Sequence, residues 1–189
     1  MHNLKAEKVI GKTIYLRNVT VDDAEFILSL RNDDKKSRFL SKTNPELDAQ
    51  KEWINSYSSD SSQAYFIICT KDDRKIGTVR VYDIIANSFC WGSWILTDEA
   101  PASASIESAL IIYKYALSRG LESAHFDVRK GNTSVYRFHE RFGAVRVSES
   151  ENDYFYKLNN DAIITSLNKY KKYMPDDIIV IDLRTLNFR

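Results

Sequence analysis

Residues 128–144 read VRKGNTSVYRFHERFGA, and this stretch decides the fold more than any other part of the chain. Its first residue, Val128, is the last residue of a short apolar strand at residues 125–128. Asn132 then opens a helix, because asparagine is a preferred residue at a helix N-cap. Gly143 ends that helix, since glycine is common just beyond a helix C-terminus. The stretch therefore predicts a strand that feeds directly into an asparagine-led helix.

The segments on either side alternate between strands and helices. A capping pattern at residues 20–23 and the pair Asn44-Pro45 predict two helices after the first strand. A third helix carries an apolar stripe and ends before Gly120. The connections between the next strands are too short for crossovers, so these strands form an antiparallel meander. The expected strands are 13–17, 64–69, 75–82, 89–96, 125–128, 145–147 and 154–158, and the expected long helix is 104–118.

This element order predicts an α/β fold in which helices cover the faces of a mixed sheet. The tail adds an apolar stripe of Ile163, Leu167, Tyr170 and Met174 at helical spacing. A strand is expected after Pro175, at residues 178–183. We therefore expect one domain over residues 1–158. Residues 159–189 form a C-terminal helix-strand extension that packs on it or on a homodimer partner.

Composition narrows the classes of protein. The chain has 189 residues, enough for one domain. Lys plus Arg number 27 against 26 for Asp plus Glu, which argues against a nucleic-acid binder. No apolar run approaches the roughly 20 residues of a membrane helix, and no secretory core follows Met1. With two cysteines only, we expect a cytoplasmic protein without membrane or nucleic-acid partners.

Motifs for several kinds of chemistry are missing from the sequence. There is no Cys/His spacing for a metal site, no GxSxG and no Walker loop, so no metal is expected. Cys69 and Cys90 lie in apolar strands and have no activating base nearby in sequence. We interpret both as buried structural cysteines.

The 128–144 stretch resembles the GNAT superfamily of acyl-CoA N-acyltransferases. Val128, Asn132, Glu140, Arg141 and Gly143 match the family's strand valine, asparagine and helix end, while His139 occupies the place of a frequent tyrosine. Residues 14–17, 22–23 and 30–33 look like the ribosomal-protein acetyltransferase branch. Residues 76–79 and 91–95 also fit that branch's meander strands. The resemblance covers about residues 12–158 in the right order, and it implies a GNAT-like fold.

The resemblance also implies a site for acetyl-CoA as co-substrate. The strand at Trp94, Ile95 and Leu96 would part from the strand that holds Val128, and the cleft would take pantetheine as a further strand. Asn132 would contact pantetheine, or would only cap its helix. The pyrophosphate would lie at the N-terminus of the long helix, and nearby positive charges would attract the phosphates. These phosphate-binding candidates are Ala102, Ser103, Ala104, Ser105, Arg137 and Arg141. The two arginines could instead form only a solvated face of their helix.

Residues 98–106 depart from the family, because its glycine-rich pyrophosphate loop is replaced by DEAPASASI. Asp98 and Glu99 would repel phosphates if they pointed inward. This departure supports an alternative, a non-catalytic acyl-CoA or ligand-binding module.

The expected activity is transfer of the acetyl group of acetyl-CoA to a primary amine of a small molecule, with an amino sugar as one candidate. A protein N-terminal acetyltransferase is a further alternative. His139 is the expected acid for the leaving thiolate, with Tyr136 as the fallback. His139 could instead simply pack beneath its helix. The base is not identified, although Asp83 and Glu107 are weak candidates. Tyr82 is expected to pack in the sheet.

Overall fold

The fold is seen in a computed structural model that describes residues 3–40, 42 and 44–183. Its strands are β1 (Lys8–Ile10), β2 (Ile14–Asn18), β3 (Ala64–Thr70), β4 (Lys75–Ile85), β5 (Ser88–Leu96), β6 (Ser123–Arg129), β7 (Val145–Glu149), β8 (Asp153–Leu158) and β9 (Ile179–Ile181). Its α-helices are α1 (Ala24–Arg31), α2 (Asp34–Ser37), α3 (Leu47–Ser58), α4 (Ala104–Ser118), α5 (Thr133–Arg141) and α6 (Asn160–Lys169). Short 3₁₀ turns lie at Val21–Asp23 and Lys171–Tyr173.

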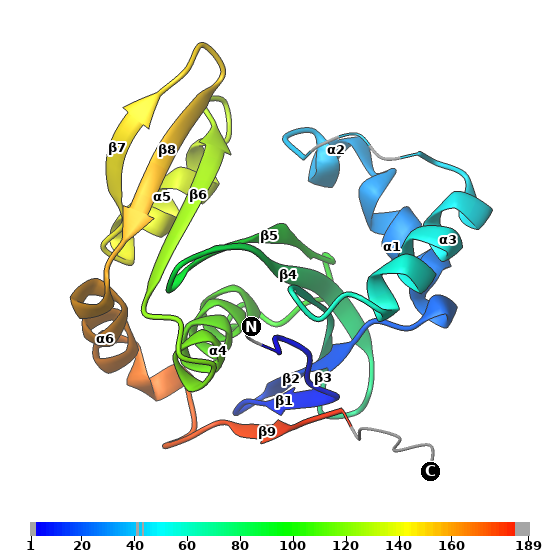
Figure 1. Cartoon of the computed structure of the whole chain (residues 1–189), viewed down its shortest axis with the longest axis horizontal. Helices are drawn as coiled ribbons and strands as arrows, with labels where there is room; N and C mark the ends of the chain where they lie inside the picture. The colour runs from blue at the N-terminus through cyan, green and yellow to red at the C-terminus, as the bar shows by residue number, and fades with distance from the viewer. Residues whose placement is uncertain (1–2, 41, 43, 184–189) are drawn as a thin grey trace.

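The strands form one mixed sheet in the order β7-β8-β6-β5-β4-β3-β2-β1-β9 (Figure 1). Neighbouring strands are antiparallel except β5 and β6, which run parallel. β6 reaches the sheet through α4, and a helical crossover of this kind is what a parallel pair requires. The expected α/β fold with a mixed sheet is confirmed, and the helix predicted over residues 104–118 is α4.

Two apolar layers lie on opposite faces of the sheet, because side chains alternate along each strand. On one face, Ile27 of α1 and Ile54 of α3 pack over Tyr65 and Ile67 of β3. On the other face, α4, α5 and α6 cover the larger core. That core includes Leu16, Phe66, Val79, Phe89, Leu110, Tyr113, Phe126, Phe142 and Ile163.

Several boundaries differ from the sequence prediction. Helix α3 begins at Leu47, because Asn44 Oδ1 accepts the N–H of Glu46 in a turn before the helix instead of capping it. Strand β1 and helix α2 have three and four residues, too few to produce a readable period. Helix α6 ends at Lys169, so Met174 follows the helix rather than extending its stripe.

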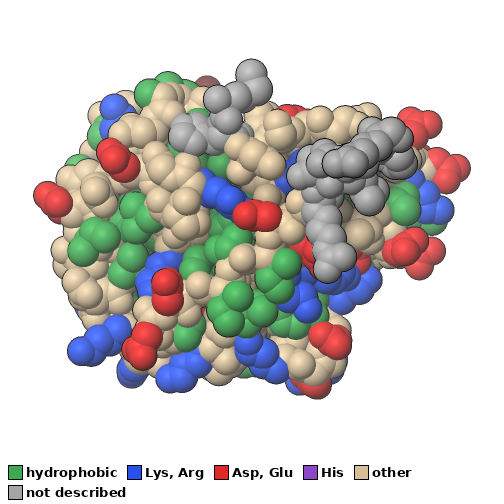
Figure 2. Space-filling view, turned by 60° about the horizontal axis from the view of Figure 1, so that its bottom comes forward, with side chains coloured by type: hydrophobic (Ala, Val, Ile, Leu, Met, Phe, Trp, Pro, Cys, Tyr) green, Lys and Arg blue, Asp and Glu red, His purple; other side chains and the backbone are tan. Residues whose placement is uncertain are grey.

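The tail segments pack against the rest of the fold. Ser166 Oγ donates to the carbonyl oxygen of Phe142 over 2.7 Å, and the rings of Phe142 and Tyr170 stack with 4.8 Å between centroids. β9 pairs with β1 and adds an edge strand to the sheet. Figure 2 views the molecule from the side of β9, and there apolar side chains lie among both signs of charge. In the described ranges, no helix has the length and apolar character needed to cross a membrane.

Candidate active site

The two parallel strands in the middle of the sheet separate. Among the described residues, β5 and β6 pair at Ser88 with Ser123 and at Phe89 with Ala124, and no further along. Beyond these pairs β5 stays with β4, while β6 continues beside β8 (Figure 1). The expected parting of the strand at Trp94 from the strand at Val128 is confirmed. Each strand therefore presents a free backbone edge to the gap.

A β-bulge lies in β5 beside this gap. Thr78 pairs with Ile95 and Arg80 with Gly92, so Ser93 and Trp94 together face the single residue between Thr78 and Arg80. Ser93 has a φ of 47°, a left-handed conformation that costs free energy for a residue other than glycine. Thr78 Oγ1 donates to the Ser93 carbonyl oxygen over 2.8 Å and holds the bulge. A bulge leaves its extra residue unpaired in the ladder, so backbone groups here can bind a ligand.

A cavity of about 530 Å³ opens at the separation and is walled by α1, α3, α5 and strands β3 to β6. Of the residues that the sequence assigned to catalysis or cofactor binding, it brings together three, namely Trp94, Asn132 and His139. The other sequence-predicted residues are not among its lining residues. These are Ile95, Leu96, Ala102, Ser103, Ala104, Ser105, Tyr136, Arg137 and Arg141.

His139 lies in an apolar cage at the inner end of the cavity. Its side chain is 5% exposed, and its ring centroid is 4.1 Å from that of Phe126 and 5.1 Å from that of Trp91. Nδ1 has no hydrogen-bond partner among the described residues. Burial lowers the pKa of His139 to about 3. The imidazole is therefore neutral near pH 7, and the imidazolium that an ordinary histidine pKa would supply is not present in the unliganded protein.

Trp94 and Asn132 line the same cavity from two sides of the gap. Trp94 lies near the end of β5, and Asn132 follows the end of β6. Trp94 Nε1 donates to Ser108 Oγ of α4 over 3.1 Å, and its ring lies 5.0 Å from that of Phe138. Asn132 occupies the N-cap of α5, yet its side chain makes no capping hydrogen bond. Its Oδ1 accepts from Ser134 Oγ over 3.4 Å, so the amide N–H groups are the part that can donate to a ligand.

Tyr136, the alternative acid, does not line the cavity. The ring of Tyr136 meets that of Tyr154 on β8 edge-on, with 5.6 Å between centroids. Arg137 and Arg141 lie on the exposed side of α5. Arg137 and Arg141 are each two positions from His139, so they lie on the opposite face of the helix, whereas Tyr136 is three positions before His139 and lies on a neighbouring face.

The loop before α4 exposes both of its acidic residues, Asp98 and Glu99. Asp98 pairs with Lys36 of α2 over 2.6 Å and has a 90% exposed side chain, so its charge is largely compensated. Ser103 is the N-cap of α4 and makes no side-chain capping hydrogen bond. The first-turn N–H groups of a helix lack intrahelical acceptors, so this end can receive an anion although the loop has no glycine.

The cavity is lined by one carboxylate and one thiol among the described residues. Among the described lining residues, Asp127 of β6 is the one carboxylate. Glu107 is buried elsewhere, where its carboxylate accepts the N–H groups of Lys12 and Thr13. Cys90 also lines the cavity, but burial raises the pKa of its thiol to about 11. Both cysteines are buried and unbridged, as the sequence indicated.

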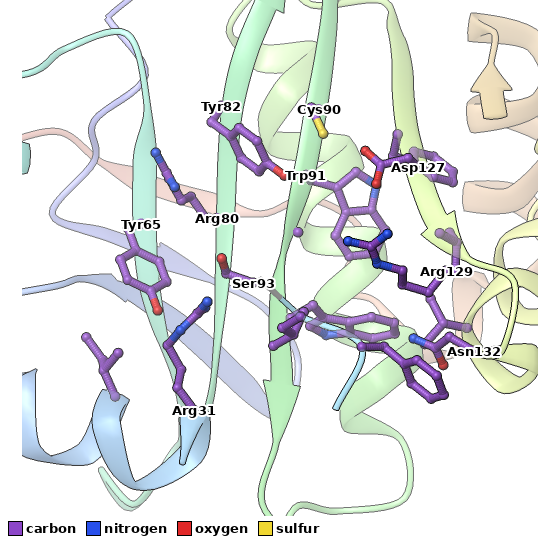
Figure 3. A pocket seen from close by; sticks show the side chains of 18 of the residues that line it. Arg31, Tyr65, Arg80, Tyr82, Cys90, Trp91, Ser93, Asp127, Arg129 and Asn132 are labelled. Atoms are coloured by element: carbon purple, nitrogen blue, oxygen red, sulfur yellow. The ribbon is translucent and has the colours of Figure 1, made fainter. Parts of the chain in front are cut away.

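Sequence reasoning missed the wall opposite β6. Arg31 of α1, Tyr65 of β3 and Arg80 of β4 project towards the cavity, as does Tyr82, which the sequence assigned to sheet packing (Figure 3). Asp127 faces them across β5 (Figure 3). The alternation of polar and apolar residues in β4 and β6 is the signal that could have found Arg80 and Asp127. It shows that these side chains leave the core face, but it does not show that they meet.

Comparisons with known proteins agree with this geometry. Residues 13–145 match the family model described as an acetyltransferase (GNAT) domain. The fold is similar to that of apo FdhC, a nucleotide-linked sugar GNAT, with a TM-score of 0.79 and 39% identity over 87% of this chain and 97% of that one. It is also similar to the spermidine N-acetyltransferase of Vibrio cholerae in complex with CoA and spermine, with a TM-score of 0.73 and 17% identity over 80% and 98% of the two chains. A GCN5-related N-acetyltransferase from Brucella melitensis gives a TM-score of 0.75 and 14% identity over 91% and 87%. None of the curated proteins matches the chain.

Proposed function

The chain belongs to the GNAT acetyltransferase family, and on this premise we propose that it transfers the acetyl group of acetyl-CoA to a primary amine of a small molecule, with an amino sugar as the first candidate. The family membership makes it an acyltransferase. The acceptor and the residue roles below are the proposal. Within it, residues 1–158 act as the acetyltransferase domain and residues 159–189 as an extension that packs on it or on a homodimer partner.

The separation of β5 from β6 at the Ser93 bulge is the observation that carries the proposal. Two free strand edges can accept an extended amide-containing chain as if it were another strand. The pantetheine arm of CoA is such a chain, and acetyl-CoA bound here would supply an activated acyl group. The uncapped Asn132 side chain and the unpartnered Nδ1 of His139 supply further polar groups beside the same gap.

The phosphates would be held by groups at the mouth of the cleft. The N-terminus of α4, around Ala102, Ser103, Ala104 and Ser105, would receive the pyrophosphate. Arg137 and Arg141 on exposed α5 positions would add positive charge. Backbone amides at Trp94, Ile95 and Leu96 would bind the pantetheine arm. An amide at the bulge would also hold the negative charge that develops on the thioester oxygen.

Asp127 would take the proton that the amine loses and pass it to solvent, and His139 would stabilise the sulfur, which leaves as a thiolate. An amine attacks only when it is neutral, so a carboxylate beside it must accept the proton that its nitrogen loses. We assign this step to Asp127, directly or through one water. The amine nitrogen bonds to the acyl carbon as the carbon–sulfur bond breaks, and the departing sulfur gains negative charge. The neutral imidazole of His139 would donate an N–H hydrogen bond to that sulfur, with Tyr136 as the alternative donor.

Transfer would be direct rather than through an acylated cysteine. Cys90 lines the cavity, but its raised pKa keeps it in the thiol form at neutral pH, and the thiol is a poor nucleophile. An acyl group therefore has one acceptor in the cleft, the bound amine. This requires both substrates to be present together.

The acceptor class is supported by the solved structure that is 39% identical, which is named as a nucleotide-linked sugar GNAT. The test is a panel of amino sugars, nucleotide-linked amino sugars, spermidine and peptide N-termini, with free CoA release and product mass as readouts. We expect amino sugars to be acetylated faster than spermidine or peptides. Acetyl-CoA should also raise the melting temperature, since a site filled at 100 times its Kd adds about 2.7 kcal/mol. No transfer and no thermal shift would overturn the proposal.

A further inference from the structure

We propose that Arg31 and Arg80 form an anion-binding wall in the acceptor half of the cleft, so that the amine acylated by this protein carries a phosphate or diphosphate ester on the same molecule. The inference rests on the proposed function for the identity of the acceptor half. The anion site itself can be measured without any acyl transfer.

Arg80 is a half-buried cation held by neutral groups. Its Nε donates to Gln63 Oε1 over 2.7 Å, and Nη2 donates to the same oxygen. Its guanidinium carbon lies 5.1 Å from the Trp53 ring centroid and 4.7 Å from that of Tyr82. Within the described residues, no carboxylate forms a salt bridge with it, and Nη1 has no hydrogen-bond acceptor. A guanidinium that is partly removed from water and held by neutral groups can gain from an anionic partner, so a ligand anion would complement this environment.

Arg31 brings a second guanidinium to the same wall. It projects from the C-terminal end of α1 into the cavity, beside Tyr65 (Figure 3). Burial raises the pKa of the Tyr65 hydroxyl, and the nearby Arg31 charge partly opposes that rise. Helix α1 and strand β4 therefore aim two cations at one side of the cavity.

The opposite wall has a different charge pattern. Asp127 lines it without a salt bridge among the described residues, whereas Arg129 is paired with Asp153 over 2.9 Å. The cavity is thus bipolar, with two guanidinium groups on the β3–β4 side and a carboxylate on the β6 side (Figure 3). A molecule with an anionic group at one end and an amine at the other would complement both walls. Its amine would then lie on the side of β6, where the acyl group is delivered.

A phosphate ester fits this wall better than the alternatives. The planar guanidinium offers paired donors that match phosphate oxygens, and two arginines can share a diphosphate. A polyamine has no negative charge to place there, and it would be repelled by both arginines. A plain amino sugar would leave the Arg80 guanidinium with neutral partners only among the described residues. The wall therefore determines specificity for anionic amines.

The test is isothermal titration of the full-length protein with a nucleoside diphosphate, inorganic pyrophosphate and spermidine. Titrations are run with and without saturating CoA, because CoA brings its own diphosphate. We expect the nucleoside diphosphate to bind in the presence of CoA, pyrophosphate to bind more weakly, and spermidine not to bind. Binding that weakens as salt rises is also expected, because the contacts are ionic.

Two substitutions test the wall and one serves as the control. Arg80→Gln should weaken nucleoside diphosphate binding by about 10- to 100-fold, the effect of losing hydrogen bonds to a charged group. Gln63→Glu should have a similar effect with Arg80 retained, because it gives that guanidinium a carboxylate partner of nearly the same shape. Arg74→Gln is the matched control, since Arg74 lies on the exposed turn before β4 and pairs with Asp72. Circular dichroism confirms that each variant is folded.

The outcomes separate this inference from the proposed function. Acetyl transfer to neutral or cationic amines with a KM unaffected by Arg80→Gln and Gln63→Glu would overturn the anion site and leave the activity standing. Anion binding that depends on Arg80 in a protein that acetylates nothing on the panel would support the site and overturn the activity. Equal affinities for wild type, Arg80→Gln and Arg74→Gln would overturn the site directly.

Discussion

The imidazole of His139 packs against the ring of Phe126 with 4.1 Å between their centroids. This contact joins α5 to β6 at the inner end of the cleft and removes the imidazole from water. Because burial lowers the pKa of His139 to about 3, the residue that the sequence predicts as the acid is uncharged at neutral pH. A catalytic role for it must therefore use a neutral N–H donor.

His139→Ala should lower kcat with little effect on acetyl-CoA affinity. Loss of one preorganised donor to a developing negative charge typically costs about 10²-fold or more in kcat. His139→Tyr should recover part of the rate, because a phenol can also donate a hydrogen bond. Steady-state kinetics on the best amine would measure this. If the alanine variant kept the wild-type kcat, His139 would serve only in packing, and Tyr136 would be the donor to the departing sulfur.

The pH dependence of stability should report the same buried imidazole. The folded pKa is about 3, whereas the unfolded value is about 6.5. The stability contribution is therefore fully present above about pH 6.5 and is lost as pH falls towards 3. At pH 5 the loss is about 2 kcal/mol from this group. Urea unfolding at pH 7 and pH 5 should show a smaller difference for His139→Leu, and an unchanged difference would contradict the burial argument.

Asp127→Asn should reduce kcat/KM and move activity to higher pH. The amide cannot accept the amine proton, so a larger share of the amine must deprotonate in solution first. General base assistance is typically worth about 10²–10⁴-fold. Asp83→Asn is a suitable comparison, because Asp83 lies outside the cavity lining and contacts His125 Nε2 at 3.3 Å. Equal pH–rate profiles for wild type and Asp127→Asn would remove Asp127 from the mechanism.

Arg137→Ala and Arg141→Ala should each weaken CoA binding, with a smaller loss for dephospho-CoA. Both side chains are exposed on α5, so their attraction for phosphate is screened by salt. Titration at low and high ionic strength would measure the effect. If wild type and both variants bind CoA and dephospho-CoA equally in all six combinations, these arginines form only a solvated face of the helix.

Asp23→Asn should destabilise the fold by about 3 kcal/mol, the typical cost of breaking a buried ion pair from one side. Burial alone would raise the pKa of Asp23, but hydrogen bonds from Arg17, Lys75 and Thr20 outweigh it and hold that pKa well below its ordinary value. Its contribution is present above about pH 4 and declines as pH falls below that. Urea unfolding measures the change. Asp22→Asn is the control, because Asp22 is exposed and should change stability by less than about 0.5 kcal/mol.

Local patterns in the sequence predicted most of the secondary structure. Gly120 and Gly143 both have positive φ, at 78° and 90°, so each ends its helix where the sequence indicated. The meander strands and α4 follow from alternation and from a long apolar stripe. The pattern failed for β1 and α2, which are short, and at Asn44, where a turn took the place of a cap. Strand β1 depends on its pairing with β2 and β9, whereas α2 and the turn at Asn44 depend on local hydrogen bonds to the side chains of Asp33 and Asn44.

The sequence by itself determined the family, the order of the elements and the place of His139 in the last turn of α5, because these depend on residues close together in the chain. Only the tertiary structure decided the chemistry of the cleft. Arg31, Arg80 and Asp127 come from α1, β4 and β6, and they face one cavity because the sheet opens between β5 and β6. The ionisation of His139 was likewise decided by Phe126 and Trp91, which burial brings against it from two other strands. A pKa depends on the whole surroundings of a group, and no spacing along the chain records those surroundings.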